Sequence, residues 1–171
     1  MVELLVTVMV IGILLALALP AMRTFLQNDR QWTQESSLVL AFNAARSEAI
    51  KQDVAGGVQV CASADGATCS GGNWANGWIV LSSASATPIQ SVGALPTGTT
   101  LTEANGNLTV TYLSTGMLNV PLLAAPVAPA FTMCDSRGVA QARYAQVTLA
   151  GQVLSSNTPG QNLASVNLTS C

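Results

Sequence analysis

An uncharged apolar segment near the N-terminus constrains this chain more than any other feature. Residues 4–19 contain no charged side chain, Glu3 precedes them and Pro20 follows them. Counted from Met1, the stretch falls within the roughly 17–25 residues that a helix needs to span a membrane. Because such a surface is strongly disfavoured in water, this segment has to be covered by lipid or by other apolar surfaces.

Three interpretations of this segment stay open from the residues alone. A cleaved signal peptide normally has a basic region before the apolar run, which is missing here, and the sequence after the run is a poor cleavage site. A plain membrane anchor explains the length but not Glu3, because a carboxylate there is costly without a partner. The third interpretation is a membrane helix that later packs against copies of itself. Glu3 would then pair with a positive charge, most simply the N-terminal amine of a neighbouring copy.

Residues 21–52 predict that the helix continues with a different surface. They contain no Gly or Pro and are rich in good helix formers. Apolar side chains recur three, four and seven residues apart, which is typical of a helix that lies on a core. We therefore predict that this half packs on the rest of the chain through Phe25, Trp32, Val39, Phe42 and Ile50. Gly12 and Pro20 are expected to weaken or bend the helix.

Beyond Gly56 the hydrophobic period changes to that of strands. Short apolar and β-branched runs are separated by Gly, Pro, Asn and Ser. Residues 120–129 are Pro-rich and predict an extended connector, and residues 156–171 an irregular polar tail. Strands are predicted at 58–61, 77–81, 89–92, 99–102, 108–113, 131–134, 143–149 and 152–155.

The fold class predicted from these patterns is α+β. A long N-terminal helix, apolar over residues 1–20 and amphipathic over residues 21–52, packs on an antiparallel sheet of six to eight short strands. The sheet belongs to a globular, disulfide-bonded head over residues 53–171.

All four cysteines follow the helix, at Cys61, Cys69, Cys134 and Cys171. Four cysteines allow three connectivities. Spacing favours Cys61–Cys69, which would close a hairpin loop, and Cys134–Cys171, which would fix the last residue. Because the count is even and the chain has no His, disulfides are favoured over a zinc site. We predict no metal and no cofactor.

The composition excludes several classes of function. Only 8% of the residues are charged, the net charge is −2, and there is no His for a catalytic triad or a general base. After residue 52 the only basic residues are Arg137 and Arg143, so neither an activated nucleophile nor a basic face for nucleic acid is evident. We predict that the chain is not an enzyme. DNA is not an expected partner, and a weak DNA contact would have to involve these two arginines.

The N-terminal segment resembles that of a known family. Residues 2–16, VELLVTVMVIGILLA, followed by Pro20, resemble the N-terminal helix of type IV pilins and type II secretion pseudopilins. The family's helix carries a Glu and a helix-weakening Pro, which correspond to Glu3 and Pro20. Motifs at residues 76–80, 131–138, 142–143 and 149–153 resemble the GspH/FimT/FimU group of minor pilins and minor pseudopilins.

The resemblance implies processing at the N-terminus. In this family a prepilin peptidase cuts after a Gly and methylates the new N-terminal residue. The leader and this Gly do not occur before Met1. We therefore expect the natural chain to start upstream, in which case prepilin peptidase is a partner.

The resemblance also implies a pilin fold and a function. The chain is expected to be a minor pilin of a type IV pilus that primes pilus assembly with other minor pilins and the major pilin, at or near the filament tip. Before assembly it would cross the inner membrane once with a periplasmic head, and afterwards lie in the extracellular pilus. Glu3, Gly12 and Pro20 are the residues expected to serve assembly.

Two alternatives remain within the family. One is a minor pseudopilin of a type II secretion system. The other is a DNA-binding pilin for natural transformation. DNA-binding members of the FimT type carry a Gly-Arg-x-Arg motif near the C-terminus, where this chain has Gly151-Gln152-Val153-Leu154 without arginine. This departure argues against the DNA-binding alternative.

Overall fold

The computed structural model describes residues 2–120 and 127–171. Over these residues the chain forms one long α-helix followed by short strands, which confirms the α+β class. The elements are α1 (Val2–Gln52), β1 (Val58–Ala62), η1 (Trp74–Asn76), β2 (Trp78–Ser82), β3 (Gln90–Val92), β4 (Thr100–Glu103), β5 (Thr109–Tyr112), β6 (Ala130–Cys134), η2 (Val139–Gln141), β7 (Arg143–Val147) and β8 (Val153–Ser155). All eight predicted strands are present among the described residues, while most of the predicted connector lies outside them.

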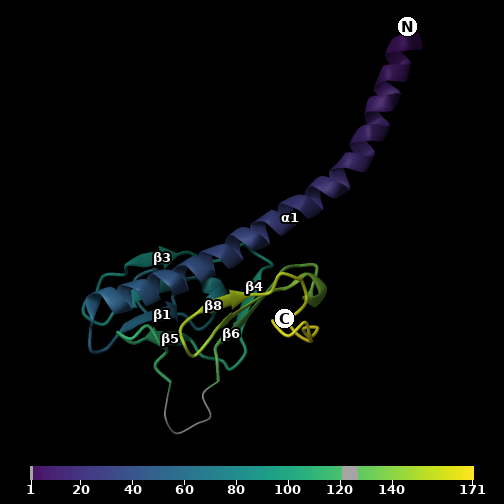
Figure 1. Cartoon of the computed structure of the whole chain (residues 1–171). Coiled ribbons are helices and arrows are strands. Elements are labelled where there is room, and N and C mark those ends of the chain that lie inside the picture. Colours follow the sequence, from purple (N-terminus) through teal and green to yellow (C-terminus); the bar gives the residue numbers. More distant parts are fainter. Residues whose placement is uncertain (1, 121–126) are drawn as a thin grey trace.

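The helix α1 is continuous, and only its C-terminal half lies on the head (Figure 1). Its 51 residues give a length of about 77 Å at 1.5 Å per residue. Gly12 and Pro20 both lie inside the helix, so neither of them ends it. The ribbon curves along the projecting half (Figure 1).

The strands form two antiparallel sheets rather than the one that was predicted. The described strands of the first sheet have the order β3-β2-β1-β5, and those of the second the order β4-β6-β7-β8. The chain leaves the first sheet after β3, begins the second with β4, and returns to pair β5 with β1. The strand β5 therefore pairs with β1 instead of with β4, its predecessor in the sequence.

An aromatic cluster joins α1 to both sheets. The ring centroid of Phe42 on α1 lies 6.5 Å from that of Tyr112 in the first sheet and 5.2 Å from that of Phe131 in the second. Trp74 in η1 packs edge-on against Phe131 at 4.9 Å. All four side chains are buried. Because each such aromatic pair adds about 0.5–1.5 kcal/mol beyond burial of its area, this cluster fixes the helix to the head.

The face of α1 that contacts the head differs from the predicted one. Phe42 is buried and Val39 is half-buried, but Phe25, Trp32 and Ile50 are 63%, 60% and 52% exposed. The predicted packing is therefore right at Phe42 and wrong at Phe25 and Trp32, and alanines form much of the real contact. The buried residues of this face are Gln31, Glu35, Leu38, Ala41, Phe42, Ala45 and Ala49.

Both disulfides join the pairs that the spacing favours. Cys61–Cys69 closes the loop that follows β1. Cys134, the last residue of β6, is bonded to Cys171, so the last residue of the chain is attached to the second sheet. The tail, residues 156–171, has an isolated β-bridge, Gln161–Asn167, and is otherwise irregular, as predicted.

Candidate functional site

The projecting half of α1 is the candidate functional surface. Every side chain from Val2 to Leu26 that the structure describes is exposed, and no charged residue occurs between Glu3 and Arg23. By length and composition α1 is apolar enough to cross a membrane, and none of its most apolar window is buried by the head. This half of the helix contributes nothing to the core of the head, so its apolar side chains are free to contact lipid or another protein.

Glu3 lies in the first turn of α1, where the helix dipole favours a negative charge. Within the described part of the chain its carboxylate has no ion pair or hydrogen bond. Gly12 lies about two and a half turns further along, and Pro20 about two turns beyond it. The three predicted assembly residues are therefore distributed along one helix and do not form a cluster.

Gly12 has no packing role within the described chain. A Cβ placed on it would meet no atom within 4 Å. A glycine in a helix interior costs roughly 0.5–1 kcal/mol relative to alanine. The head therefore gives no reason for a glycine at this position.

A second apolar surface continues along α1 on the side away from the head. We call it the outer stripe. Helical geometry places its residues on one side of α1, opposite the buried face. The outer stripe comprises Met22, Phe25, Trp32 and Leu40, all exposed. Ile50 is 52% exposed but lies beside Gly116 of the head, so it does not belong to the stripe.

Arg137, in the turn after β6, joins the head to α1 close to the projecting half. Its guanidinium binds the carboxylate of Asp135, with Nη2 2.7 Å from Oδ2. It also donates to two side chains of α1, from Nη1 to Asn28 Oδ1 at 2.6 Å and from Nη2 to Gln31 Oε1 at 3.1 Å. Burial alone would raise the pKa of Asp135, but the hydrogen bonds and the charge of Arg137 outweigh burial and lower the pKa.

Arg143 on β7 faces Glu35 on α1. Arg143 Nε lies 3.9 Å from Glu35 Oε2, and among the described residues neither Arg143 Nε nor Glu35 Oε1 has a hydrogen-bond partner. A cavity of about 10 Å³ adjoins both side chains, which is close to the volume that one water needs. Burial raises the pKa of Glu35, and the charge of Arg143 offsets only part of this rise.

A third arginine joins α1 to the loops of the head. Arg46 donates from Nε to Gly116 O at 3.1 Å and from Nη2 to Ala150 O at 3.3 Å. Arg137 and Arg143 were the two candidates for a DNA contact. In the structure both side chains contact α1 and join it to the head. Each of these two side chains is 18% exposed and faces a carboxylate.

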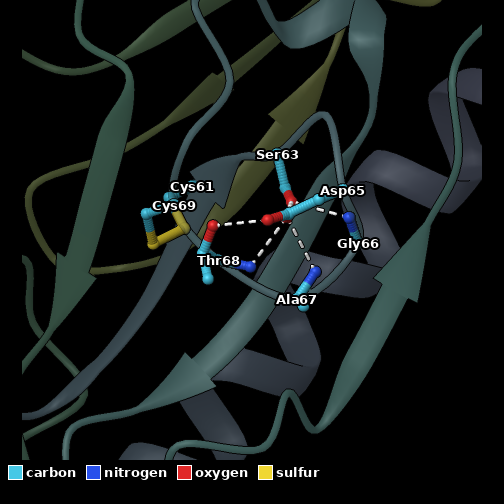
Figure 2. Close-up of a disulfide and its surroundings, with 7 residues drawn as sticks. All are labelled: Cys61, Ser63, Asp65, Gly66, Ala67, Thr68 and Cys69. Carbon is cyan, nitrogen blue, oxygen red and sulfur yellow. Dashed lines mark hydrogen bonds between the residues drawn. A yellow bond between two sulfur atoms is a disulfide. The ribbon is translucent and has the colours of Figure 1, made fainter.

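The loop closed by Cys61–Cys69 is organised by a carboxylate (Figure 2). Asp65 Oδ2 accepts from Thr68 Oγ1 at 2.6 Å, and Oδ1 accepts from Ser63 Oγ and from the amides of Ala67 and Thr68. These hydrogen bonds, led by the Thr68 hydroxyl, hold the pKa of Asp65 well below its usual range. The carboxylate of Asp65 therefore has a structural role in this loop. Within the described residues no group of His, Cys, Asp and Glu could hold a metal ion.

A long helix with an exposed apolar half, lying on a small disulfide-bonded head of two sheets, has the architecture of a pilin. The chain belongs to the GspH family, because the family model for type II transport protein GspH matches residues 36–152. It is also similar to the type IV minor pilin FimU of Pseudomonas aeruginosa in two crystal structures. The first match has 22% identity and a TM-score of 0.59 and covers 77% of this chain and 92% of FimU. The second has 22% identity and a TM-score of 0.54 and covers 71% and 88%.

At this identity the likeness to FimU shows the pilin fold. A comparison with curated protein sequences gave no significant match. Family and fold together identify a structural, non-enzymatic protein, in agreement with the prediction from composition.

Proposed function

We propose that the chain is a minor pilin of a type IV pilus, which primes pilus assembly and is incorporated into the filament at or near its tip. The observation that carries the proposal is the projecting half of α1, an exposed apolar helix with a carboxylate in its first turn. Such a surface needs two successive environments, lipid before assembly and other helices afterwards. A plain membrane anchor would need only the first.

The exposed apolar helix supports a path from membrane to filament. Before assembly, the projecting half of α1 lies in the inner membrane with the head in the periplasm, an oxidising compartment that suits two disulfides. In the filament, lipid is replaced by the helices of other minor pilins and of the major pilin. Glu3 then pairs with the N-terminal amine of a neighbouring subunit and sets the axial register. The open space around Gly12 lets a second helix approach closely, and Pro20 lets the helix bend as it leaves the membrane.

A second candidate function is that of a minor pseudopilin in a type II secretion system. The match to the family of type II transport protein GspH favours it. The name of the structural relative FimU, a type IV minor pilin, favours the pilus. A DNA-binding pilin is the weakest of the three candidates, because both arginines of the head have carboxylate partners.

A deletion strain tests the proposal. Surface filaments are sheared and counted, and type II secretion and DNA uptake are measured in the same strain, with the chain restored from a plasmid as control. The proposal predicts a loss of filaments with secretion intact. Lost secretion with normal filaments would instead identify a pseudopilin, and failed DNA uptake with normal filaments a DNA-binding pilin.

A further inference from the structure

A polar cleft lies where α1 begins to contact the head. Its volume is about 110 Å³, smaller than the roughly 300–1,000 Å³ of typical small-molecule sites. It therefore fits the head group of one side chain. One wall is α1, and the other is formed by the loop before β4 and the turn after β6. The lining includes Gln27, Arg30, Gln31, Gln34, residues 96–99, Asp135 and Ser136.

The cleft carries one uncompensated charge, and it is positive. Arg30 is exposed and has no ion pair or hydrogen bond with any described residue. The carboxylate of Asp135 is the other charged group in the lining, and Arg137 neutralises it through a contact of 2.7 Å. In a chain with a net charge of −2, a local positive site of this kind selects for a negative ligand.

Two glutamines of the lining have buried polar atoms without a partner among the described residues, the donor Gln31 Nε2 and the acceptor Gln34 Oε1. Gln31 is only 3% exposed, and its Oε1 accepts from Arg137. Its Nε2 has no partner among the described residues, although a buried donor normally has one. The hydroxyl-bearing residues Thr97, Thr99 and Ser136 lie in the same lining. The guanidinium of Arg30 and these hydroxyl groups suit a carboxylate, which accepts hydrogen bonds with both oxygens.

The location of the cleft indicates the source of this carboxylate. The cleft lies directly after the projecting half of α1, which is the part that the proposed function places among other subunits. When helices bundle through that half, the next residues of α1 lie close to the neighbouring heads. We propose that the cleft binds an acidic side chain on the head of an adjacent pilin subunit. This inference rests on the proposed function and adds a polar, directional contact to the apolar one.

Site-specific crosslinking in cells tests the proposal. A photo-crosslinking residue replaces Thr97 in the full chain, and a second variant carries the same residue at Leu14 in the projecting helix. The expected result is a crosslink from Thr97 to another pilin, reduced at least about fivefold by Arg30→Gln and restored in part by Arg30→Lys. Arg23→Gln is the matched control, since Arg23 is an exposed arginine of α1 outside the cleft, and it should leave the yield unchanged.

The two probe positions separate failure of this inference from failure of the proposed function. Crosslinks from Leu14 without crosslinks from Thr97 would overturn the cleft as an interface and leave the pilin function intact. A Thr97 crosslink that Arg30→Gln does not weaken would overturn carboxylate recognition. Missing crosslinks at both positions would overturn the function and the inference together. If Thr97 gives no crosslink but glutarate shifts the NMR signals of Arg30 in the purified full chain, the cleft binds a free carboxylate and the proposal is wrong.

Discussion

At the residue scale, several carboxylates of this chain have hydrogen-bond or ion-pair partners in the part of the chain that the structure describes, and Glu3 does not. Asp65 and Glu103 each accept several hydrogen bonds within their own loops, and Asp135 is paired with Arg137. Glu3 is different, because it lies in the first turn of α1 beside the apolar residues 4–19 and its carboxylate has no partner within the described residues. A carboxylate that the chain leaves unpaired in an apolar setting has to find its partner elsewhere.

The first prediction concerns this carboxylate. Glu3→Ala should leave the head folded and the helix inserted in the membrane, yet reduce the amount of the chain in sheared filaments at least about tenfold, since the register-setting ion pair is lost. Immunoblots of filament and membrane fractions measure both quantities. Asp29→Ala, which removes an exposed acid from the same helix, is the control. If the Glu3→Ala chain is incorporated into filaments as well as the wild-type chain, Glu3 has no role in assembly.

The second prediction concerns pH and Glu35. Burial raises the pKa of Glu35 above 4.5 in the folded chain, so the folded state binds this proton more tightly than the unfolded state. The contribution of Glu35 to stability is therefore largest below pH 4.5 and falls as the pH rises through the raised pKa. Glu35→Gln removes this titration. We expect the Tm of the wild-type chain in detergent to fall relative to the Tm of Glu35→Gln as the pH rises. A difference in Tm between the two chains that does not change with pH would contradict a raised pKa of Glu35.

At the element scale, local sequence patterns predicted the positions of the strands. They did not predict how the strands pair into sheets or which face of α1 is buried, because both depend on tertiary packing. Turn residues mark both ends of most strands, so all eight appear within a few residues of their predicted positions. The division into two sheets depends on pairings such as β1 with β5, between segments far apart in the sequence. The part of the buried face of α1 nearest the projecting half was missed, because Gln31 and Glu35 look like surface residues until Arg137 and Arg143 reach them from the head.

The third prediction tests the corrected helix face with a matched pair of aromatic residues. Phe42→Ala should lower the free energy of unfolding by about 3–5 kcal/mol, because it leaves a cavity among three other aromatic rings. Trp32→Ala should change it by no more than about 0.5 kcal/mol, since this ring is exposed. Denaturant unfolding of the full chain in detergent measures both. Comparable losses for the two variants would show that the outer stripe also supports the head.

The fourth prediction concerns the C-terminal tail. Cys134–Cys171 spans 37 residues, for which chain-entropy arguments give a stabilisation of about 4 kcal/mol. Replacing both cysteines with serine should make residues 156–171 the first site of proteolysis, because few apolar contacts hold this segment. The matched control replaces Cys61 and Cys69, which close a separate loop. If digestion of the tail is unchanged in the Cys134/Cys171 variant, this disulfide is not what holds it.

At the scale of the whole molecule, the chain combines a folded head with a helix that extends well beyond it (Figure 1). The sequence alone predicted this division, because a charge-free apolar segment cannot belong to a head with its own core. It did not predict the polar cleft, whose lining comes from α1, from residues 96–99 and from the turn after β6. No local pattern links three segments so far apart. The arginine that marks the cleft, Arg30, looks like any exposed charge on a helix.

The central claim is that this chain becomes a subunit of a surface filament, and the most direct measurement is its recovery there. Filaments are sheared from cells that produce an epitope-tagged full chain, purified, and probed by immunoblot and immunogold labelling. The account predicts the chain in the filament fraction in amounts far below the major pilin, with gold at or near filament ends. A chain that stays wholly in the membrane fraction while filaments are abundant would contradict it.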